Sequence, residues 1–99
     1  MKKLLLGVIL LFSSFFFGQN FIEGVTYYPN PVSNSKLYIK TTKNMCKDIT
    51  ITDVLGKLVL VAIVEEGKEL LDISRLGKGV YLIRIEEDNK VETRKLIVK

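Results

Sequence analysis

The residues after position 18 lack a helical period, and this feature most limits the fold. No window of 19–99 keeps apolar side chains at a 3.6-residue spacing for the length of an average helix. Instead, short runs rich in β-branched and aromatic residues recur, separated by turn residues about every 8 to 12 positions. We predict strands over 25–28, 36–41, 48–54, 57–64, 69–73, 79–87 and 91–98. Their short connections predict antiparallel pairing.

Two of these connections predict tight hairpins. Asp53 is followed three positions later by Gly56, and a short acceptor followed by glycine is typical of a type I turn with a bulge. Asn89 lies between the last two predicted strands and tolerates positive φ, which predicts a second tight turn. Neighbouring strands in the chain should therefore pair at both places.

The segment 28–31 reads Tyr-Pro-Asn-Pro and does not fit a central strand. Pro29 and Pro31 have no backbone N–H to donate to a sheet, and each proline favours an extended residue before it. We expect a stiff arm or an edge at this point.

Leu76, Gly79 and Tyr81 have the spacing of a tyrosine corner, in which a tyrosine hydroxyl bonds to backbone a few residues upstream. Glycine would let the ring lie close; the alternative is a buried strand that begins with an aromatic residue. With about seven strands, this corner favours an all-β, immunoglobulin-like antiparallel β-sandwich. The predicted core consists of Ile39, Ile49, Ile51, Val59, Ile73, Tyr81, Ile83, Ile85, Leu96 and Val98.

The first 18 residues predict a secretory signal peptide. Lys2 and Lys3 precede a mostly apolar run over 4–17. As a helix this run covers about 21 Å, against about 30 Å of bilayer hydrocarbon. Cleavage is expected before Gln19, with a cut after Ser14 as the competing site and an uncleaved membrane anchor as the less favoured alternative. Residues 19–26 are then a short linker, and 27–99 form one domain.

The composition excludes most chemistry. The chain has no His, no Trp and one Cys, which removes histidine-based catalysis, metal sites built from His and Cys, and an internal disulfide. Lys2 and Lys3 contribute two positive charges to the net charge of +4. In the rest of the chain, positive and negative residues are interspersed. Lysines such as Lys43 and Lys47 next to Asp48 predict a solvated surface, so we expect no nucleic-acid partner.

For each residue or segment that could catalyse a reaction or bind a ligand, a simpler structural role is expected. Cys46 lacks a histidine base, so a loop thiol is expected. The acidic runs 65–69 and 86–88 lack the spacing of a calcium loop and predict solvated turns. The segment 77–79 is too short for a phosphate-binding loop. The basic residues Arg94, Lys95 and Lys99 are typical of protection at a sheet edge. We therefore predict no enzyme activity, no cofactor, no metal and no small-molecule substrate.

Four segments together resemble a known family. These are 28–31, 53–59, 71–81 and 94–99, in this order. They are similar to the type A C-terminal sorting domain of the type IX secretion system, over about residues 27–99. The positions that match its motifs are Pro29, Asn30, Pro31, Asp53, Gly56, Val59, Leu76, Gly79, Tyr81, Lys95 and Lys99.

The resemblance implies a non-enzymatic targeting role. Such domains follow exported cargo, which reaches the periplasm through the Sec machinery and signal peptidase. An outer-membrane translocon then recognises the folded domain, and a cell-surface sortase usually removes it. The expected location is the periplasm in transit, then the cell surface or the medium.

One feature departs from the family pattern, because only about eight residues separate Gly18 from the predicted domain. This leaves no room for a folded cargo. A gene remnant and a free-standing domain that occupies or regulates the translocon are the two leading explanations. A small secreted adhesion or ligand-binding sandwich is the third, although no loop is long or aromatic enough to suggest a binding site.

Overall fold

A computed structural model describes residues 21–99, so the predicted signal peptide lies outside the described residues. The described part is built from strands: β1 (Thr26–Tyr28), β2 (Lys36–Lys40), β3 (Lys47–Asp53), β4 (Leu58–Val64), β5 (Leu70–Asp72), β6 (Gly79–Glu87) and β7 (Lys90–Val98). Within residues 21–99 there is no helix, and so none long and apolar enough to cross a membrane.

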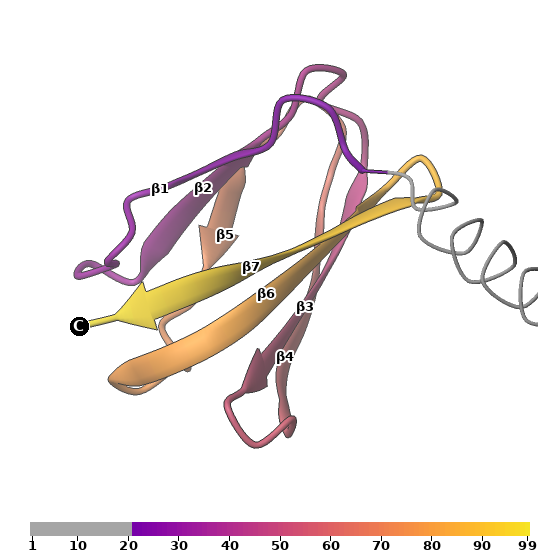
Figure 1. Cartoon of the computed structure of the whole chain (residues 1–99). Coiled ribbons are helices and arrows are strands. Elements are labelled where there is room, and N and C mark those ends of the chain that lie inside the picture. Colours follow the sequence, from indigo (N-terminus) through magenta and orange to yellow (C-terminus); the bar gives the residue numbers. More distant parts are fainter. Residues whose placement is uncertain (1–20) are drawn as a thin grey trace, which may run out of the picture.

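The strands form two antiparallel sheets that face each other (Figure 1). One sheet has the order β1-β2-β5, and the other has the order β4-β3-β6-β7. The predicted all-β sandwich of seven strands is therefore confirmed. The predicted strand ends differ from the observed ones by at most one residue: Val54, for example, belongs to a turn and not to β3.

Both predicted hairpins are confirmed. Asp53 and Gly56 close a turn between β3 and β4, in which the Gly56 amide donates to the Asp53 carbonyl at 3.0 Å and Gly56 has a φ of +84°. Asp88 and Asn89 form the two-residue turn between β6 and β7, with φ values of +53° and +62°. Positive φ at both central residues gives the twist that a two-residue hairpin requires.

The core lies between the sheets. Of the ten side chains predicted for it, seven are buried, while Val59, Tyr81 and Val98 are half-buried and pack against its margin. The sequence interpretation missed five buried side chains: Ile22, Val32, Leu37, Val64 and Leu71. Ile22 lies in the segment predicted as a linker, yet it is only 4% exposed.

The sandwich has two ends. At one end lie the turns β1–β2, β3–β4 and β5–β6 together with the last residues of β7, toward the lower left of Figure 1. We call this the motif end. The far end holds the β2–β3 loop (41–46), the β4–β5 loop (65–69) and the β6–β7 turn. The motif end leaves its cations exposed, whereas the far end buries Lys47 and Glu87.

Candidate recognition surface

Asn30 joins the β1–β2 turn to the last strand. Its side-chain amide nitrogen donates to the Lys95 carbonyl at 3.2 Å, and its side-chain oxygen accepts from the Ile97 amide at 3.0 Å. Asparagine carries one donor and one acceptor group on a short side chain, so it can satisfy a strand edge in this way. The proline motif (29–31) is therefore fixed to the terminal motif (94–99) by its central residue.

The backbone continues this attachment at Val32. Its amide donates to the Ile97 carbonyl at 2.8 Å, and its carbonyl accepts from the Lys99 amide at 2.8 Å. Val32 forms an isolated parallel bridge with Val98, and its side chain is fully buried. The free edge of β7 is thereby covered near its end, which removes a template for pairing with another chain.

Tyr27 adds a third contact to the same edge, because its hydroxyl donates to the Lys95 carbonyl at 2.8 Å. The sequence interpretation missed both Tyr27 and Val32. Their only local signal is that they flank the two prolines, and their partners lie more than 60 positions away in the chain.

The corner motif (76–81) closes as predicted. The Tyr81 hydroxyl donates to the Gly77 carbonyl at 2.7 Å, and half-buried Leu76 packs against the core. We predicted that glycine at position 79 is needed to let the Tyr81 ring lie close, and this reason is wrong. A Cβ at Gly79 would lie 3.8 Å from the ring, which is an ordinary contact distance. Glycine is favoured instead by its φ of +155°, which other residues rarely adopt.

The hairpin motif (53–59) is organised by one carboxylate. Asp53 Oδ1 accepts from the amides of Leu55 and Lys57, each at 2.9 Å, while the Asp53 amide donates to the Lys57 carbonyl. A bulge follows where β4 pairs with the end of β3, and half-buried Val59 packs against the core there. Asp53, Gly56 and Val59 therefore set the shape of this turn.

The sheet register places three of these motifs side by side. Asp53 pairs with Tyr81 across β3 and β6, and Tyr81 pairs with Leu96 across β6 and β7. Two positions further along the same pair of strands, Gly79 pairs with Val98. Because Asn30 attaches the fourth motif to β7, all four segments that were matched by sequence converge at the motif end.

The motif end exposes more positive than negative charge. Its exposed cations are Lys36, Lys57, Arg75, Lys78, Lys95 and Lys99. Its carboxylates are those of Asp53, which is half-buried in the turn, and Asp72, which pairs in register with Lys36. A hydrogen bond from the Ser74 amide to Asp72, at 2.9 Å, holds the pKa of this carboxyl below its ordinary value; the Ser74 hydroxyl, Lys36 and Arg75 lower it further.

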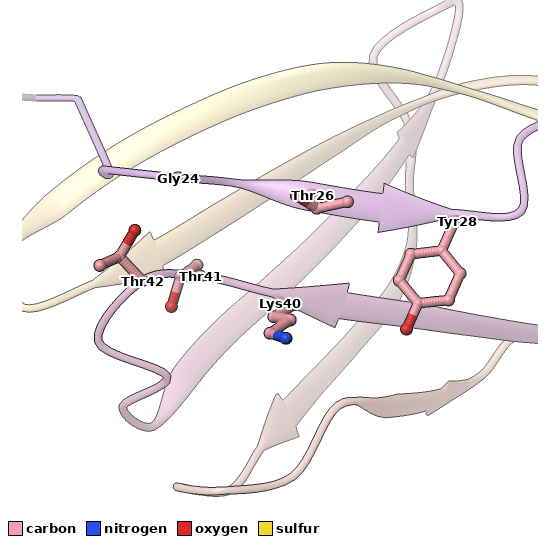
Figure 2. A pocket seen from close by; sticks show the side chains of 6 residues that line it. All are labelled: Gly24, Thr26, Tyr28, Lys40, Thr41 and Thr42. Atoms are coloured by element: carbon pink, nitrogen blue, oxygen red, sulfur yellow. The ribbon is translucent and has the colours of Figure 1, made fainter.

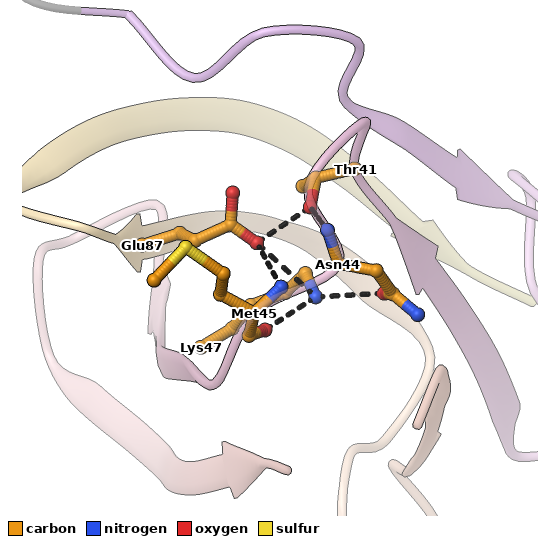
Figure 3. Close-up of polar contacts among 5 residues, drawn as sticks. All are labelled: Thr41, Asn44, Met45, Lys47 and Glu87. Atoms are coloured by element: carbon orange, nitrogen blue, oxygen red, sulfur yellow. Dashed lines mark hydrogen bonds and ion pairs between the residues drawn. The ribbon is translucent and has the colours of Figure 1, made fainter. Parts of the chain in front are cut away.

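The far end instead buries charge (Figure 3). Lys47 is fully buried and its ammonium lies 3.3 Å from Glu87, which is 3% exposed. Glu87 also accepts from the Thr41 hydroxyl and the Met45 amide, and Lys47 also donates to Asn44 and to the Met45 carbonyl. The prediction that Lys47 and Glu87 lie on solvated surfaces is therefore wrong. The Lys47 ammonium and the Glu87 carboxylate are buried together because their charges neutralise each other, and loop 41–46 supplies their remaining hydrogen bonds.

An open hollow of about 400 Å³ lies beside β1 and the end of β2 (Figure 2). Its lining consists of Gly24, Thr26, Tyr28, Lys40, Thr41 and Thr42. Lys40 is the one ionisable cation of this lining, and no carboxylate faces it from these six positions.

Other candidate sites remain unsupported by geometry. Cys46 is exposed in loop 41–46. Among residues 21–99, no three His, Cys, Asp or Glu side chains gather closely enough to hold a metal ion.

Comparison with known proteins identifies a family for this chain. No curated protein matches the chain. A family model does match, that of the secretion system C-terminal sorting domain, or Por secretion tail, over residues 26–99. The match begins at the first residue of β1 and covers every strand of the sandwich. The chain therefore belongs to the family of secretion system C-terminal sorting domains.

Proposed function

We propose that this domain is a secretion-targeting module whose motif end is the surface that the type IX translocon and sortase recognise. Family membership implies targeting for secretion across the outer membrane by a non-catalytic domain. The observation that supports the finer proposal is the convergence of four separate motifs at one end of the sandwich, with Asn30 bonded to the backbone of β7.

The motif end has the properties of a recognition surface. The exposed prolines and the tight β3–β4 turn give it a fixed shape, and six exposed cations surround them. Placed charges on a rigid surface favour correct partners through electrostatic complementarity and reject wrong ones. An acidic face on the translocon or sortase would complement this end.

The proposed route begins with the signal peptide. The Sec machinery would deliver the chain to the periplasm, and signal peptidase would cut near Gln19. The folded sandwich would then be recognised by the translocon and carried to the cell surface or the medium. Nothing in this route requires a cofactor, a nucleic acid or a small-molecule substrate.

A reporter fusion tests this proposal. A fluorescent protein inserted after Gln19 should reach the surface or the medium in cells with an intact type IX translocon. It should stay in the periplasm in an otherwise identical strain that lacks the translocon. Equal export from both strains would overturn the proposal.

Deletion of the terminal motif is a poor substitute for this test. Leu96 is fully buried and Ile97 bonds to both Asn30 and Val32, so removal of residues 95–99 would damage the fold as well as the surface. Substitution of the exposed side chains Lys95 and Lys99 changes the surface charge and leaves these contacts in place.

A further inference from the structure

Large apolar side chains gather on the outer face of the four-stranded sheet. Within residues 21–99, ten large apolar side chains are exposed, and seven of them belong to this sheet or to its β3–β4 turn. These seven are Val54, Leu55, Leu58, Val61, Ile63, Val80 and Leu82. An exposed apolar patch of this kind on a small domain marks an interaction site.

The sheet register makes the patch continuous near the motif end. Thr52 pairs with Leu58 on one side and with Leu82 on the other, so these three side chains form one row. The row faces solvent, because the next residue on β6, Ile83, is fully buried on the other face. Val80 lies two positions before Leu82 on β6 and therefore shares its face.

The β3–β4 turn carries the most exposed part of the patch. Val54 is 70% exposed and Leu55 is 90% exposed, and this turn is the lowest part of the sandwich in Figure 1. The carboxylate of Asp53 fixes the turn by accepting from the amides of Leu55 and Lys57. Two apolar side chains are thus held on a projecting turn, where polar residues are usual. We call the exposed apolar side chains nearest this turn the apolar tip: Val54, Leu55, Leu58, Val80 and Leu82.

Four exposed lysines border the apolar tip: Lys57, Lys78, Lys95 and Lys99. Lys57 precedes Leu58 in the chain, Lys95 pairs with Leu82 across β6 and β7, and the other two flank the paired ends of these strands. Among the ion pairs of residues 21–99, none includes one of these lysines. The one carboxylate of the turn, that of Asp53, already accepts from two backbone amides. The border of the apolar tip is therefore positive.

We propose that the apolar tip docks on a phospholipid bilayer whose surface contains anionic lipids. The apolar side chains enter the boundary between head groups and acyl chains, and the four ammonium groups contact the phosphates of the head groups. Binding of this kind grows with the buried apolar area and with the attraction between basic residues and anionic lipids. Family membership implies secretion across the outer membrane, so the domain meets a lipid surface on its route.

The residue types favour a bilayer over a protein partner. Protein interfaces are depleted in lysine, and their binding energy comes mainly from Trp, Tyr and Arg side chains that enter pockets. The apolar tip and its border consist of leucine, valine and lysine. A lysine stem packs along an apolar surface while its charge stays in the head-group layer. A projecting tip of this composition can enter a fluid lipid surface without a matching pocket.

The other half of the same face supplies an internal comparison. Val61 and Ile63 are also well exposed, at 67% and 64%. However, Asp48 pairs with Ile63 in the sheet, and the exposed Glu65 and Glu66 follow β4. Anionic lipid repels these carboxylates. We therefore expect contact through the apolar tip, with the motif end toward the bilayer and Val61 and Ile63 in solvent.

Vesicle binding tests the proposal. The protein used is the chain that the predicted cleavage leaves, from Gln19, because the apolar run 4–17 is expected to bind lipid by itself. This chain contains every described strand and buried side chain, and a cooperative thermal transition checks that it is folded. Vesicles of phosphatidylethanolamine and phosphatidylglycerol should bind it about tenfold more tightly than vesicles of phosphatidylcholine, and added salt should weaken this binding. Absence of binding to the anionic vesicles would overturn the proposal.

Paired substitutions locate the contact. Val54→Ser with Leu55→Ser removes apolar area from the tip and keeps the backbone hydrogen bonds of the turn, so it should weaken binding to the anionic vesicles about tenfold. Val61→Ser with Ile63→Ser is the matched control, because it removes similarly exposed apolar side chains outside the tip, and it should keep the original affinity. Equal affinities of the two double variants would contradict docking through the tip.

A fluorescent label gives a second measurement that does not depend on how well the serine variants fold. In a Cys46→Ser chain, an environment-sensitive dye is attached at Leu55→Cys or at Ile63→Cys. On the anionic vesicles, the dye at position 55 should brighten and move its emission to shorter wavelength, and the dye at position 63 should not. No change at position 55, or the same change at both positions, would overturn the proposal.

The inference does not rest on recognition by the translocon. The vesicles contain no protein, so failure of vesicle binding leaves the reporter test of export unaffected, and the reverse also holds. Capture of a protein through position 55, without any response to vesicles, would show that the apolar tip serves a protein partner and not a bilayer.

Discussion

The two ends of the sandwich show how one small fold separates recognition from stability. The motif end is held by hydrogen bonds to backbone, such as those between Asn30 and β7 and those that the Asp53 carboxylate accepts in its turn, and it leaves its cations in solvent. The far end buries Lys47 and Glu87 and satisfies both with loop 41–46. Charges in water are available to a partner, whereas charges in a buried pair fix the positions of their own segments.

The difference also predicts different responses to mutation. Loss of a buried charge partner leaves its counterpart desolvated, which is costly. Loss of an exposed hydrogen bond exchanges one partner for water, which costs much less. The far end should therefore dominate stability, and the motif end should dominate export.

The largest effect is expected at Glu87. Glu87→Ala leaves the Lys47 ammonium buried without its carboxylate and should lower the free energy of unfolding by about 3–5 kcal/mol. Urea denaturation measures this change. Asp88→Ala is the matched control: its pair with Lys43 is exposed, so it should cost about 0–1 kcal/mol. Similar losses in both variants would remove the proposed distinction between the ends.

A smaller effect is expected at Asn30. Asn30→Ala removes two hydrogen bonds to β7 and should lower the free energy of unfolding by about 1–3 kcal/mol, measured in the same way. Asn30→Asp keeps the acceptor for the Ile97 amide and loses the donor to the Lys95 carbonyl, so it should fall between Ala and the original residue. An Asp variant as stable as the original would show that the donor contributes nothing.

At the tyrosine corner we expect a loss of about 1 kcal/mol. Tyr81→Phe keeps the half-buried ring and removes only the hydroxyl that donates to the Gly77 carbonyl. Thermal unfolding followed by circular dichroism checks this. A loss above about 3 kcal/mol would mean that the corner, and not the far end, is the main stabilising element.

The smallest effect is the pH response of Asp72. Its pKa is lower in the folded state, chiefly because the Ser74 amide donates to it. The contribution to stability is therefore present above the pKa of the unfolded chain and is lost as pH falls through the pKa of the folded chain. A carboxyl NMR titration should find the Asp72 pKa below its ordinary value, and Ser74→Pro, which removes the amide donor, should raise it. An unchanged pKa in that variant would contradict this cause.

Local signals in the sequence were enough to predict the hairpins and the corner. Asp53 with Gly56, Asn89, and Tyr81 with its upstream backbone all act within a few residues of one another. Alternation along β3 and β6 likewise identified Ile49, Ile51, Ile83 and Ile85 as core residues. Such features depend on short-range geometry, which a single sequence contains.

The sequence interpretation failed where distant segments meet. Burial of Lys47 depends on Glu87, which lies 40 positions away, and by itself a lysine beside an aspartate is typical of a surface. The attachment of Asn30 to Ile97 crosses 67 positions. The family resemblance named both motifs, but only the assembled sheet places them in contact.

Export of a reporter with reversed charges at each end tests the central claim most directly. The fluorescent chain would carry either Lys95→Glu with Lys99→Glu at the motif end, or Lys43→Glu with Lys68→Glu at the far end. All four side chains are exposed, and both double variants change the net charge equally. The account predicts that the motif-end variant loses about tenfold in translocon-dependent export, while the far-end variant keeps it. Equal export of the two variants would contradict the claim that the motif end is the surface that is recognised.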